Sequence, residues 1–265
     1  MSQAFTPEFV AKPALQPEAA TPIALFLDFD GTLVEIAPSP EQVRIDRRVP
    51  AALDALRQQL GGALALVSGR PVAFLDAMMA PYRFDAAGLH GAQIRIGGEE
   101  APLAGPSEAL REATRAMVRF ANGHVGVIVE DKRQSVALHW RLAPALAEEA
   151  VALMEGLAER LGPAMRLQRG KAVAELVPAA ASKGNAIRGL LGQGVYAGRL
   201  PVFIGDDVTD EDGFAAVDAA GGLSIRIGAG ETRAQHRLAS PTVLRRILLA
   251  AAEEGGLTLD SFLRG

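Results

Sequence analysis

The chain has 265 residues, with 31 acidic side chains against 27 lysines and arginines, so its formal net charge is -4. It contains no cysteine, which excludes disulfide frameworks, thiolate zinc sites, iron–sulfur clusters and cysteine nucleophiles. The length and the apolar fraction of 49% suit one large domain or two modest domains. The acid excess argues against a nucleic-acid partner, because basic surfaces bind phosphate backbones.

The N-terminal segment lacks the features of a secretory signal. Residues 1–22 carry several prolines and scattered charges without a continuous apolar stretch, so we expect a disordered tail. No apolar run approaches the roughly 20 residues that span a bilayer as a helix. We therefore expect a cytoplasmic, monomeric protein without membrane contact.

Short apolar runs that end in polar residues alternate with helical patterns in both halves of the chain. The predicted strands are residues 23–27, 63–67, 201–204 and 223–227, and helices are predicted after Pro50 and at residues 186–191. Short apolar runs suit strands that are buried on both faces of a parallel sheet. This alternation predicts an α/β fold, in which ligands bind beyond the carboxyl ends of the strands.

The middle of the chain has a different pattern. Helices are predicted at residues 107–120 and 145–161, and strand pairs at 125–129 with 134–140 and at 165–168 with 172–177, the first pair joined by a turn at 130–133. Strand pairs joined by short turns are antiparallel, so we expect a separate α+β unit. We place this insert at residues 105–178, between the core segments 23–104 and 179–265.

Carboxylates follow two of the predicted core strands. Asp28 and Asp30 follow the first strand, and Asp206 and Asp207 follow a later one, with Asp210 close behind. Close like charges are unfavourable in a cleft unless a cation joins them, and carboxylate oxygens suit Mg²⁺. An isolated pair would more often be a helix cap or a solvated turn. The combination with Ser68 and Lys183 favours a metal site.

Ser68 and Lys183 also have simpler interpretations. Ser68 could cap the helix that follows it, and Leu66 occupies the position where a serine-hydrolase elbow needs glycine. No glycine-rich loop precedes Lys183, which excludes a nucleotide-binding P-loop. A lysine at the start of a helix is disfavoured by the helix dipole, which favours a specific anionic partner.

In chain order, these residues resemble the four motifs of the haloacid dehalogenase (HAD) superfamily of phosphatases. The motifs are Asp28-Phe29-Asp30-Gly31-Thr32, Ser68, Lys183 and Gly205-Asp206-Asp207-x-x-Asp210. After the tail, the chain also resembles the trehalose-6-phosphate phosphatase family of that superfamily. This second resemblance rests on Ser68-Gly69-Arg70-Pro71, Gly88-Leu89-His90-Gly91, Glu130-Asp131-Lys132, His139-Trp140-Arg141 and Glu175. Trp140 departs from the tyrosine that relatives often carry there.

The resemblance implies a HAD-like Rossmannoid core with an inserted α+β cap, and Mg²⁺-dependent hydrolysis of trehalose 6-phosphate. Asp28 would be the nucleophile that forms an aspartyl phosphate, and Asp30 the general acid and base. Ser68 and Lys183 would bind the phosphoryl oxygens. The metal ligands would be Asp28, the main-chain carbonyl of Asp30 and Asp206, with Asp207 or Asp210 as a direct or outer-shell partner.

The resemblance further implies that the cap binds the sugar. The implied substrate contacts are Glu130, Lys132 and Glu175 in the cap, and Thr32, Arg70, His90 and Gly91 in the core. Plain solvation is the simpler interpretation of the charged hairpin at residues 130–133. Glu175 is harder to explain in that way, because it interrupts an apolar strand.

Three other functions compete with this interpretation. The nearest is another capped sugar phosphatase of the same superfamily, acting on sucrose phosphate or on mannosyl-3-phosphoglycerate. A catalytically silent sensor of sugar phosphates would keep the same residues. A signalling receiver domain also combines an acidic cluster with a lysine, but it needs neither Asp30 nor an inserted cap.

Overall fold

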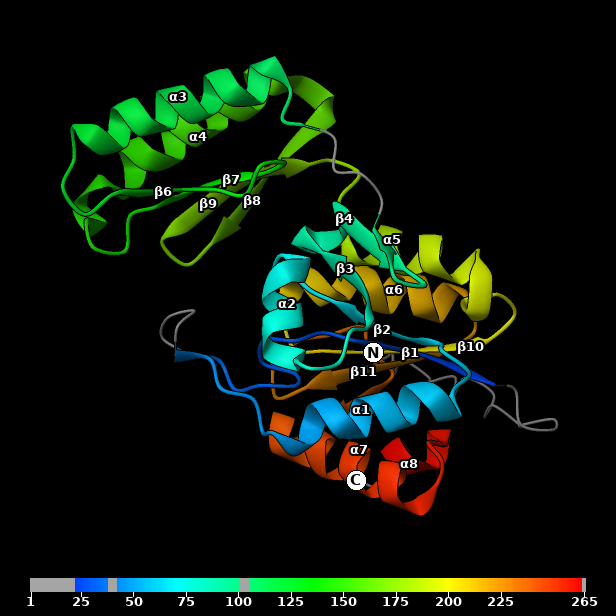
Figure 1. Cartoon of the computed structure of the whole chain (residues 1–265). Coiled ribbons are helices and arrows are strands. Elements are labelled where there is room, and N and C mark those ends of the chain that lie inside the picture. Colours follow the sequence, from blue (N-terminus) through cyan, green and yellow to red (C-terminus); the bar gives the residue numbers. More distant parts are fainter. Residues whose placement is uncertain (1–21, 38–41, 101–104, 264–265) are drawn as a thin grey trace, which may run out of the picture.

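The computed structural model describes residues 22–37, 42–100 and 105–263. The predicted disordered tail therefore lies outside the described residues, except for Pro22. Figure 1 shows a large sheet with helices on both faces and, above it, a smaller sheet whose helices cover the far side. The predicted α/β class with a parallel-sheet core is confirmed.

Within the described residues, eight strands form the large sheet. In spatial order they are β12 (His236–Leu238), β11 (Leu223–Ile227), β10 (Leu200–Gly205), β1 (Ile23–Leu27), β2 (Leu64–Val67), β3 (Asp85–Gly88), β4 (Gln93–Ile96) and β5 (Glu99–Glu100). The first six are parallel, and β4 and β5 are antiparallel additions at one edge. In β1 every residue is buried, which explains its unbroken apolar sequence.

Two apolar clusters attach the helices to the large sheet. On one face, Leu25 and Leu27 pack in a cluster with α1 (Arg48–Gln59), α2 (Val72–Met79), α7 (Pro241–Glu254) and α8 (Leu259–Leu263). On the other face, Phe26 packs with α5 (Lys183–Leu191) and α6 (Glu211–Ala219). Successive residues of β1 therefore serve opposite faces, as the two-residue period of a strand requires.

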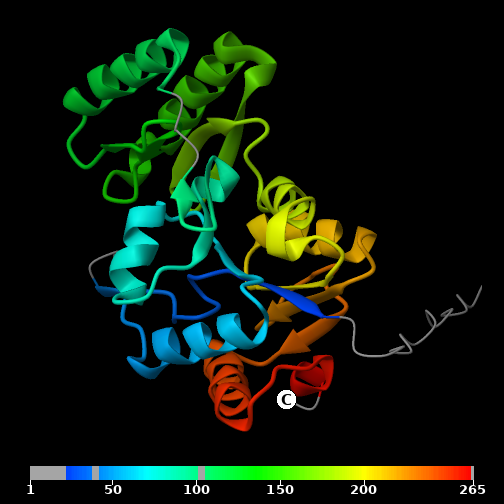
Figure 2. The same ribbon diagram turned by 45° about the vertical axis from the view of Figure 1, so that its right-hand side comes forward.

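The smaller sheet is antiparallel and has the order β6 (Ile128–Asp131), β7 (Val136–His139), β9 (Val173–Pro178) and β8 (Met165–Gly170). Its strands lie within residues 105–178, but the domain boundaries themselves remain a prediction. The helices α3 (Glu108–Asn122) and α4 (Ala147–Leu161) cover one face through an apolar cluster that includes Met117 and Met154. The other face is turned toward the large unit in both views (Figures 1 and 2).

The prediction of a turn at residues 130–133 was wrong. Glu130 and Asp131 belong to β6, where they pair with Ala137 and Val136, and the turn comprises residues 132–135. At the other end of β6, Val125 is fully exposed and precedes the strand. The run of charged residues at 130–133 suggested a solvated turn, but strand pairing continues through the first two of them.

The short strands β3, β4, β5 and β12 were not predicted. Their sequences contain small or charged residues and lack the apolar runs that identified the central strands. In the described part of the chain, no helix combines the length and apolar character needed to cross a membrane.

Candidate active site

The polar motifs meet where the central strands of the large sheet end, at their carboxyl ends. β1 is hydrogen-bonded in parallel to both β10 and β2, so the residues that follow these strands lie side by side. This arrangement places Asp28, Ser68 and Asp206 at the carboxyl ends of three adjacent strands. Lys183, the first residue of α5, contacts Asp28 from the side of the helix layer.

Asp28 and Lys183 form the buried centre of the site. The Lys183 Nζ lies 2.7 Å from Oδ1 of Asp28 and 2.6 Å from Oδ1 of Asp210, and the Thr32 hydroxyl donates to Oδ2 of Asp28 at 3.2 Å. Burial raises the pKa of Asp28 well above its usual value, the charge of Asp210 raises it further, and Lys183 opposes both. Burial alone would lower the pKa of Lys183, but the two carboxylates outweigh it and raise that pKa.

In the part of the chain that the structure describes, three carboxylates are grouped around this centre. Asp28, Asp206 and Asp210 each offer one oxygen, and these oxygens lie within 4.8 Å of one another. The pKa of Asp206 is raised to about 6, first by burial and then by the charge of Asp210. Lys183 offsets only part of this negative charge. A compact set of carboxylate oxygens with surplus negative charge fits a hard divalent cation such as Mg²⁺.

The two candidates for the last acidic position have different surroundings. Asp210 is fully buried, and its Oδ2 accepts hydrogen bonds from the backbone N–H groups of Asp206 at 3.0 Å and Asp207 at 2.9 Å. Asp207 is exposed and caps the short helical turn Val208–Asp210. Asp210 thus belongs to the acidic cluster and holds its loop in place, whereas Asp207 lies outside the cluster.

Two glycines allow the carboxylates to approach the backbone. A Cβ atom at Gly31 would lie 2.0 Å from Oδ2 of Asp206, and one at Gly205 would lie 2.3 Å from Cγ of Asp210. Gly31 also has a positive φ of 72°, which side chains disfavour. Any side chain at either position would displace a carboxylate of the cluster.

Asp30 is held by Arg70. The Nε and Nη2 atoms of Arg70 donate to the two carboxylate oxygens of Asp30 at 2.7 and 2.9 Å, and the guanidinium lies 4.7 Å from the ring centre of Phe74. Ser68 is buried, and its Oγ accepts a hydrogen bond from the backbone N–H of Arg70 at 3.1 Å. Arg70 was predicted to contact the sugar. In the structure it contacts Asp30, the residue predicted to act as general acid and base.

His90 and Gly91 lie in a short helical turn beside Ser68. The backbone N–H of His90 donates to the carbonyl of Ser68 at 2.9 Å, and a Cβ at Gly91 would lie 2.9 Å from the carbonyl of Ser182. Burial lowers the pKa of His90 to about 4, and the positive charge of Lys183 contributes. The imidazole is therefore neutral at pH 7.

The lowered pKa of His90 predicts a pH-dependent stability. The unfolded state binds this proton near pH 6.5 and the folded state only near pH 4, so protonation of the unfolded state lowers the free energy of unfolding by about 3 kcal/mol as pH falls between these values. Urea unfolding at pH 7 and pH 4.5 should show that wild type loses about 3 kcal/mol more stability over this interval than His90→Asn does. His236→Asn, at an exposed histidine, should keep the wild-type pH dependence. Parallel curves for wild type and His90→Asn would contradict the assignment.

The cap places its predicted residues in one network. The Nζ of Lys132 lies 3.1 Å from Oε2 of Glu175 and 3.8 Å from Oε2 of Glu130. Two residues for which no role was predicted complete the network: Ser135 donates to Glu175 at 2.6 Å, and Nε2 of His139 lies 3.1 Å from Glu130. The bond with His139 lowers the pKa of Glu130, and the positive charges of Lys132 and Arg70 add to this effect.

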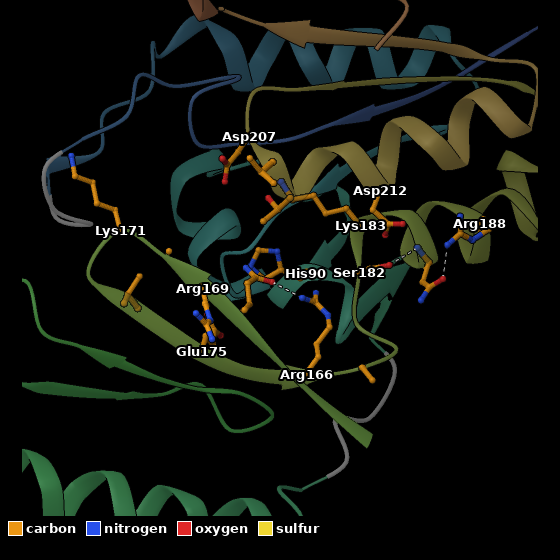
Figure 3. Close-up of a pocket in the computed structure, with 17 residues that line it drawn as sticks. His90, Arg166, Arg169, Lys171, Glu175, Ser182, Lys183, Arg188, Asp207 and Asp212 are labelled. Atoms are coloured by element: carbon orange, nitrogen blue, oxygen red, sulfur yellow. Dashed lines mark hydrogen bonds between the residues drawn. The ribbon is translucent and has the colours of Figure 1, made fainter. Parts of the chain in front are cut away.

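A pocket of about 830 Å³ separates the cap from the core (Figure 3). Four of the predicted site residues, His90, Glu175, Lys183 and Asp207, are among the residues that line it. The other predicted site residues are not among the described residues of its lining.

Sequence reasoning missed several polar residues of this pocket. Arg166 and Gln168 on β8 belong to its lining, and Nη2 of Arg166 donates to the carbonyl of Ala181 at 2.9 Å, which joins the cap to the segment before α5. These polar residues alternate with Met165 and Leu167, which pack against the apolar cap cluster. This two-residue alternation was a usable signal for the open face of the strand.

Comparisons with known proteins agree with the geometry. Residues 26–244 match the family described as trehalose-phosphatase. A "Probable trehalose-phosphate phosphatase" of Sinorhizobium fredii is 43% identical over 231 residues, covering 86% of this chain and 87% of that protein. The "Trehalose-6-phosphate phosphatase" of Escherichia coli is 41% identical over 224 residues, covering 84% of each.

A solved structure supports the same relationship. The crystal structure of a "trehalose-6-phosphate phosphatase related protein" matches with a TM-score of 0.71 at 26% identity, covering 87% of this chain and 97% of that chain. The shared fold extends over both the large sheet and the cap. The chain therefore belongs to the trehalose-phosphatase family, whose members are phosphoric monoester hydrolases of the HAD superfamily.

Proposed function

We propose that this enzyme hydrolyses trehalose 6-phosphate to trehalose and phosphate, using Mg²⁺ and an aspartyl-phosphate intermediate. The observation that carries the proposal is the contact between Asp28 and Lys183 inside an acidic cluster, beside a pocket whose opposite wall is the polar face of the cap. The names of the relatives support the choice of substrate.

In the first step, a carboxylate oxygen of Asp28 attacks phosphorus, and the bond from phosphorus to the sugar oxygen breaks. Asp30 donates its proton to the departing sugar oxygen. Lys183 and Ser68 hold phosphoryl oxygens, Lys183 as a point charge. In the second step, Asp30 takes a proton from water, the resulting hydroxide attacks phosphorus, and phosphate leaves Asp28 unmodified.

The residues that would hold Mg²⁺ are Asp28, Asp206 and the main-chain carbonyl of Asp30. Asp210 would be an outer-shell residue that holds Lys183 and the Asp206 loop in place, because its oxygens already accept from Lys183 and from two backbone N–H groups. When bound, the ion would neutralise charge between the nucleophile and the phosphate.

Mg²⁺ is expected to raise the Tm of the substrate-free protein, because it relieves repulsion within the acidic cluster. Scanning calorimetry with and without millimolar MgCl₂ measures this shift. Asp206→Asn should reduce it strongly, whereas Asp54→Asn, at a partly buried carboxylate of α1 that is paired with Arg57, should leave it unchanged. Equal shifts in wild type and Asp206→Asn would count against this metal site.

On the substrate side, Glu130, Lys132 and Glu175 would bind sugar hydroxyls from the cap. The core side would be formed by Thr32, Arg70, His90 and Gly91. One residue from each side supports this division: Glu175 of the cap and His90 of the core both line the pocket, and the charge of Glu175 influences the pKa of His90.

Glu175→Ala and Glu130→Ala are expected to lower kcat/KM for trehalose 6-phosphate about 10- to 100-fold, because buried hydroxyls of the sugar lose charged partners. The rate with p-nitrophenyl phosphate should change little, since this small ester has no sugar for the cap to bind. Glu159→Ala, on the exposed side of α4, is the control. Equal losses with both substrates would refute a sugar-binding role.

The decisive experiment is phosphate release from trehalose 6-phosphate with Mg²⁺, and with EDTA as control. Sucrose phosphate and mannosyl-3-phosphoglycerate are run in parallel. A preference for either alternative would replace the proposed substrate. Absence of release from the whole panel would favour the sensor.

A further inference from the structure

We propose that β7 and the residue that precedes it position both cap carboxylates, with Ser135 holding Glu175 and His139 holding Glu130. The inference rests on the proposed function, because it takes these two carboxylates as partners of the sugar. Ser135 and His139 act through the glutamates and are therefore positioning residues.

The register of the cap sheet places β7 between the two glutamates. Ala137 of β7 pairs with Glu130 on β6 on one side and with Glu175 on β9 on the other. Ser135, the last residue of the turn before β7, and His139, the last residue of β7, lie two residues before and after Ala137. The Ser135 side chain reaches the carboxylate of Glu175, and the His139 side chain reaches that of Glu130.

Ser135 fixes the orientation of Glu175. Its Oγ donates to Oε1 at 2.6 Å, and Lys132 approaches Oε2 at 3.1 Å, so each carboxylate oxygen has its own partner. Ser135 and Glu175 are 3% and 9% exposed, which makes an unsatisfied oxygen costly. The carbonyl of Ser135 also accepts the backbone N–H of Lys132 at 3.0 Å, so the same residue orders the turn that carries the lysine.

His139 restrains Glu130, whose side chain is 51% exposed. An exposed glutamate samples several rotamers, and binding a ligand would have to restrict them. The Nε2–H of His139 donates to Oε2 at 3.1 Å and holds the carboxylate beside Lys132. The restriction is thus made before the substrate arrives, which should lower KM and leave kcat unchanged.

The first test uses Ser135→Ala with a matched control. Ser224→Ala also removes a buried hydroxyl that donates to a carboxylate, that of Asp218 at 2.7 Å, but it lies in the core on β11. Ser135→Ala should raise KM for trehalose 6-phosphate about threefold to tenfold, with kcat and the rate with p-nitrophenyl phosphate unchanged. Ser224→Ala should leave all of these values unchanged at a comparable loss of Tm. Equal effects of the two variants would overturn the role of Ser135.

The second test uses the more exposed His139, where folding is not at risk. His139→Ala should raise KM severalfold. His139→Gln, which retains an N–H donor, should have a KM close to that of wild type. In double-mutant cycles, adding His139→Ala to Glu130→Ala, or Ser135→Ala to Glu175→Ala, should cause no further loss of kcat/KM. Additive losses, or failure of glutamine to restore KM, would overturn the positioning roles.

The same measurements separate this inference from the proposed function. If the wild-type enzyme releases phosphate from p-nitrophenyl phosphate but not from trehalose 6-phosphate, the proposed substrate is wrong. If it hydrolyses trehalose 6-phosphate normally and the cycles are additive, only the positioning roles of Ser135 and His139 fail.

Discussion

Asp28→Asn is expected to lower phosphate release from trehalose 6-phosphate by about 10⁴-fold or more, because an amide cannot form the phosphoryl-enzyme. The fold should survive, since the pKa of Asp28 is already raised by burial and by neighbouring carboxylates, and the substitution removes a buried charge. Steady-state rates measure the first effect, and thermal unfolding measures the second. The loss should be as large with p-nitrophenyl phosphate, because the nucleophile serves every substrate.

Asp54→Asn is the matched control for this prediction. It makes the same chemical change at a partly buried carboxylate on α1, and we expect wild-type rates. A folded Asp28→Asn protein that retains more than a few per cent of wild-type activity would rule out Asp28 as the nucleophile.

Lys183→Met is expected to have the largest effect on stability. It removes the cation that contacts both Asp28 and Asp210, and it leaves those buried carboxylates facing one another and Asp206. Breaking a buried ion pair on one side typically costs about 3–5 kcal/mol, so the free energy of unfolding should fall by about that amount. Urea unfolding in EDTA measures it, and activity should be lost as well.

Arg188→Met, at an exposed position of the same helix, is the control for Lys183. Its side chain donates to Asn185 at 2.7 Å, and we expect a change below about 0.5 kcal/mol. If the two variants unfolded at the same urea concentration, Lys183 would not be the counter-ion that stabilises the acidic cluster.

The core of the site could be predicted from the sequence because its geometry follows from sheet topology. Asp28, Ser68 and Asp206 each follow an apolar run, and the carboxyl ends of adjacent parallel strands lie at one edge. The contact between Arg70 and Asp30 could not be predicted in this way. It depends on the path of two loops and on the orientation of a long side chain, neither of which has a periodic signal.

The cap shows the same limit more clearly. The resemblance assigned roles to Glu130, Lys132 and Glu175 but none to Ser135 and His139, whose contacts depend on the register of β7 with both neighbours. Sequence alternation assigns a residue to a face of a strand without specifying which residue lies opposite. The turn predicted at residues 130–133 was misplaced for a related reason, because the charged residues Glu130 and Asp131 of a paired strand have the sequence character of a solvated loop.

The close approach of carboxylates to Gly31 and Gly205 has a consequence for mutational tolerance. Neither glycine has a functional group, yet even the methyl of alanine would overlap Asp206 or Asp210. Selection for activity would therefore constrain these two positions as tightly as it constrains the acids beside them. In a library of random variants, loss of activity on substitution of Gly31 or Gly205 would therefore reflect the space that the neighbouring carboxylate occupies.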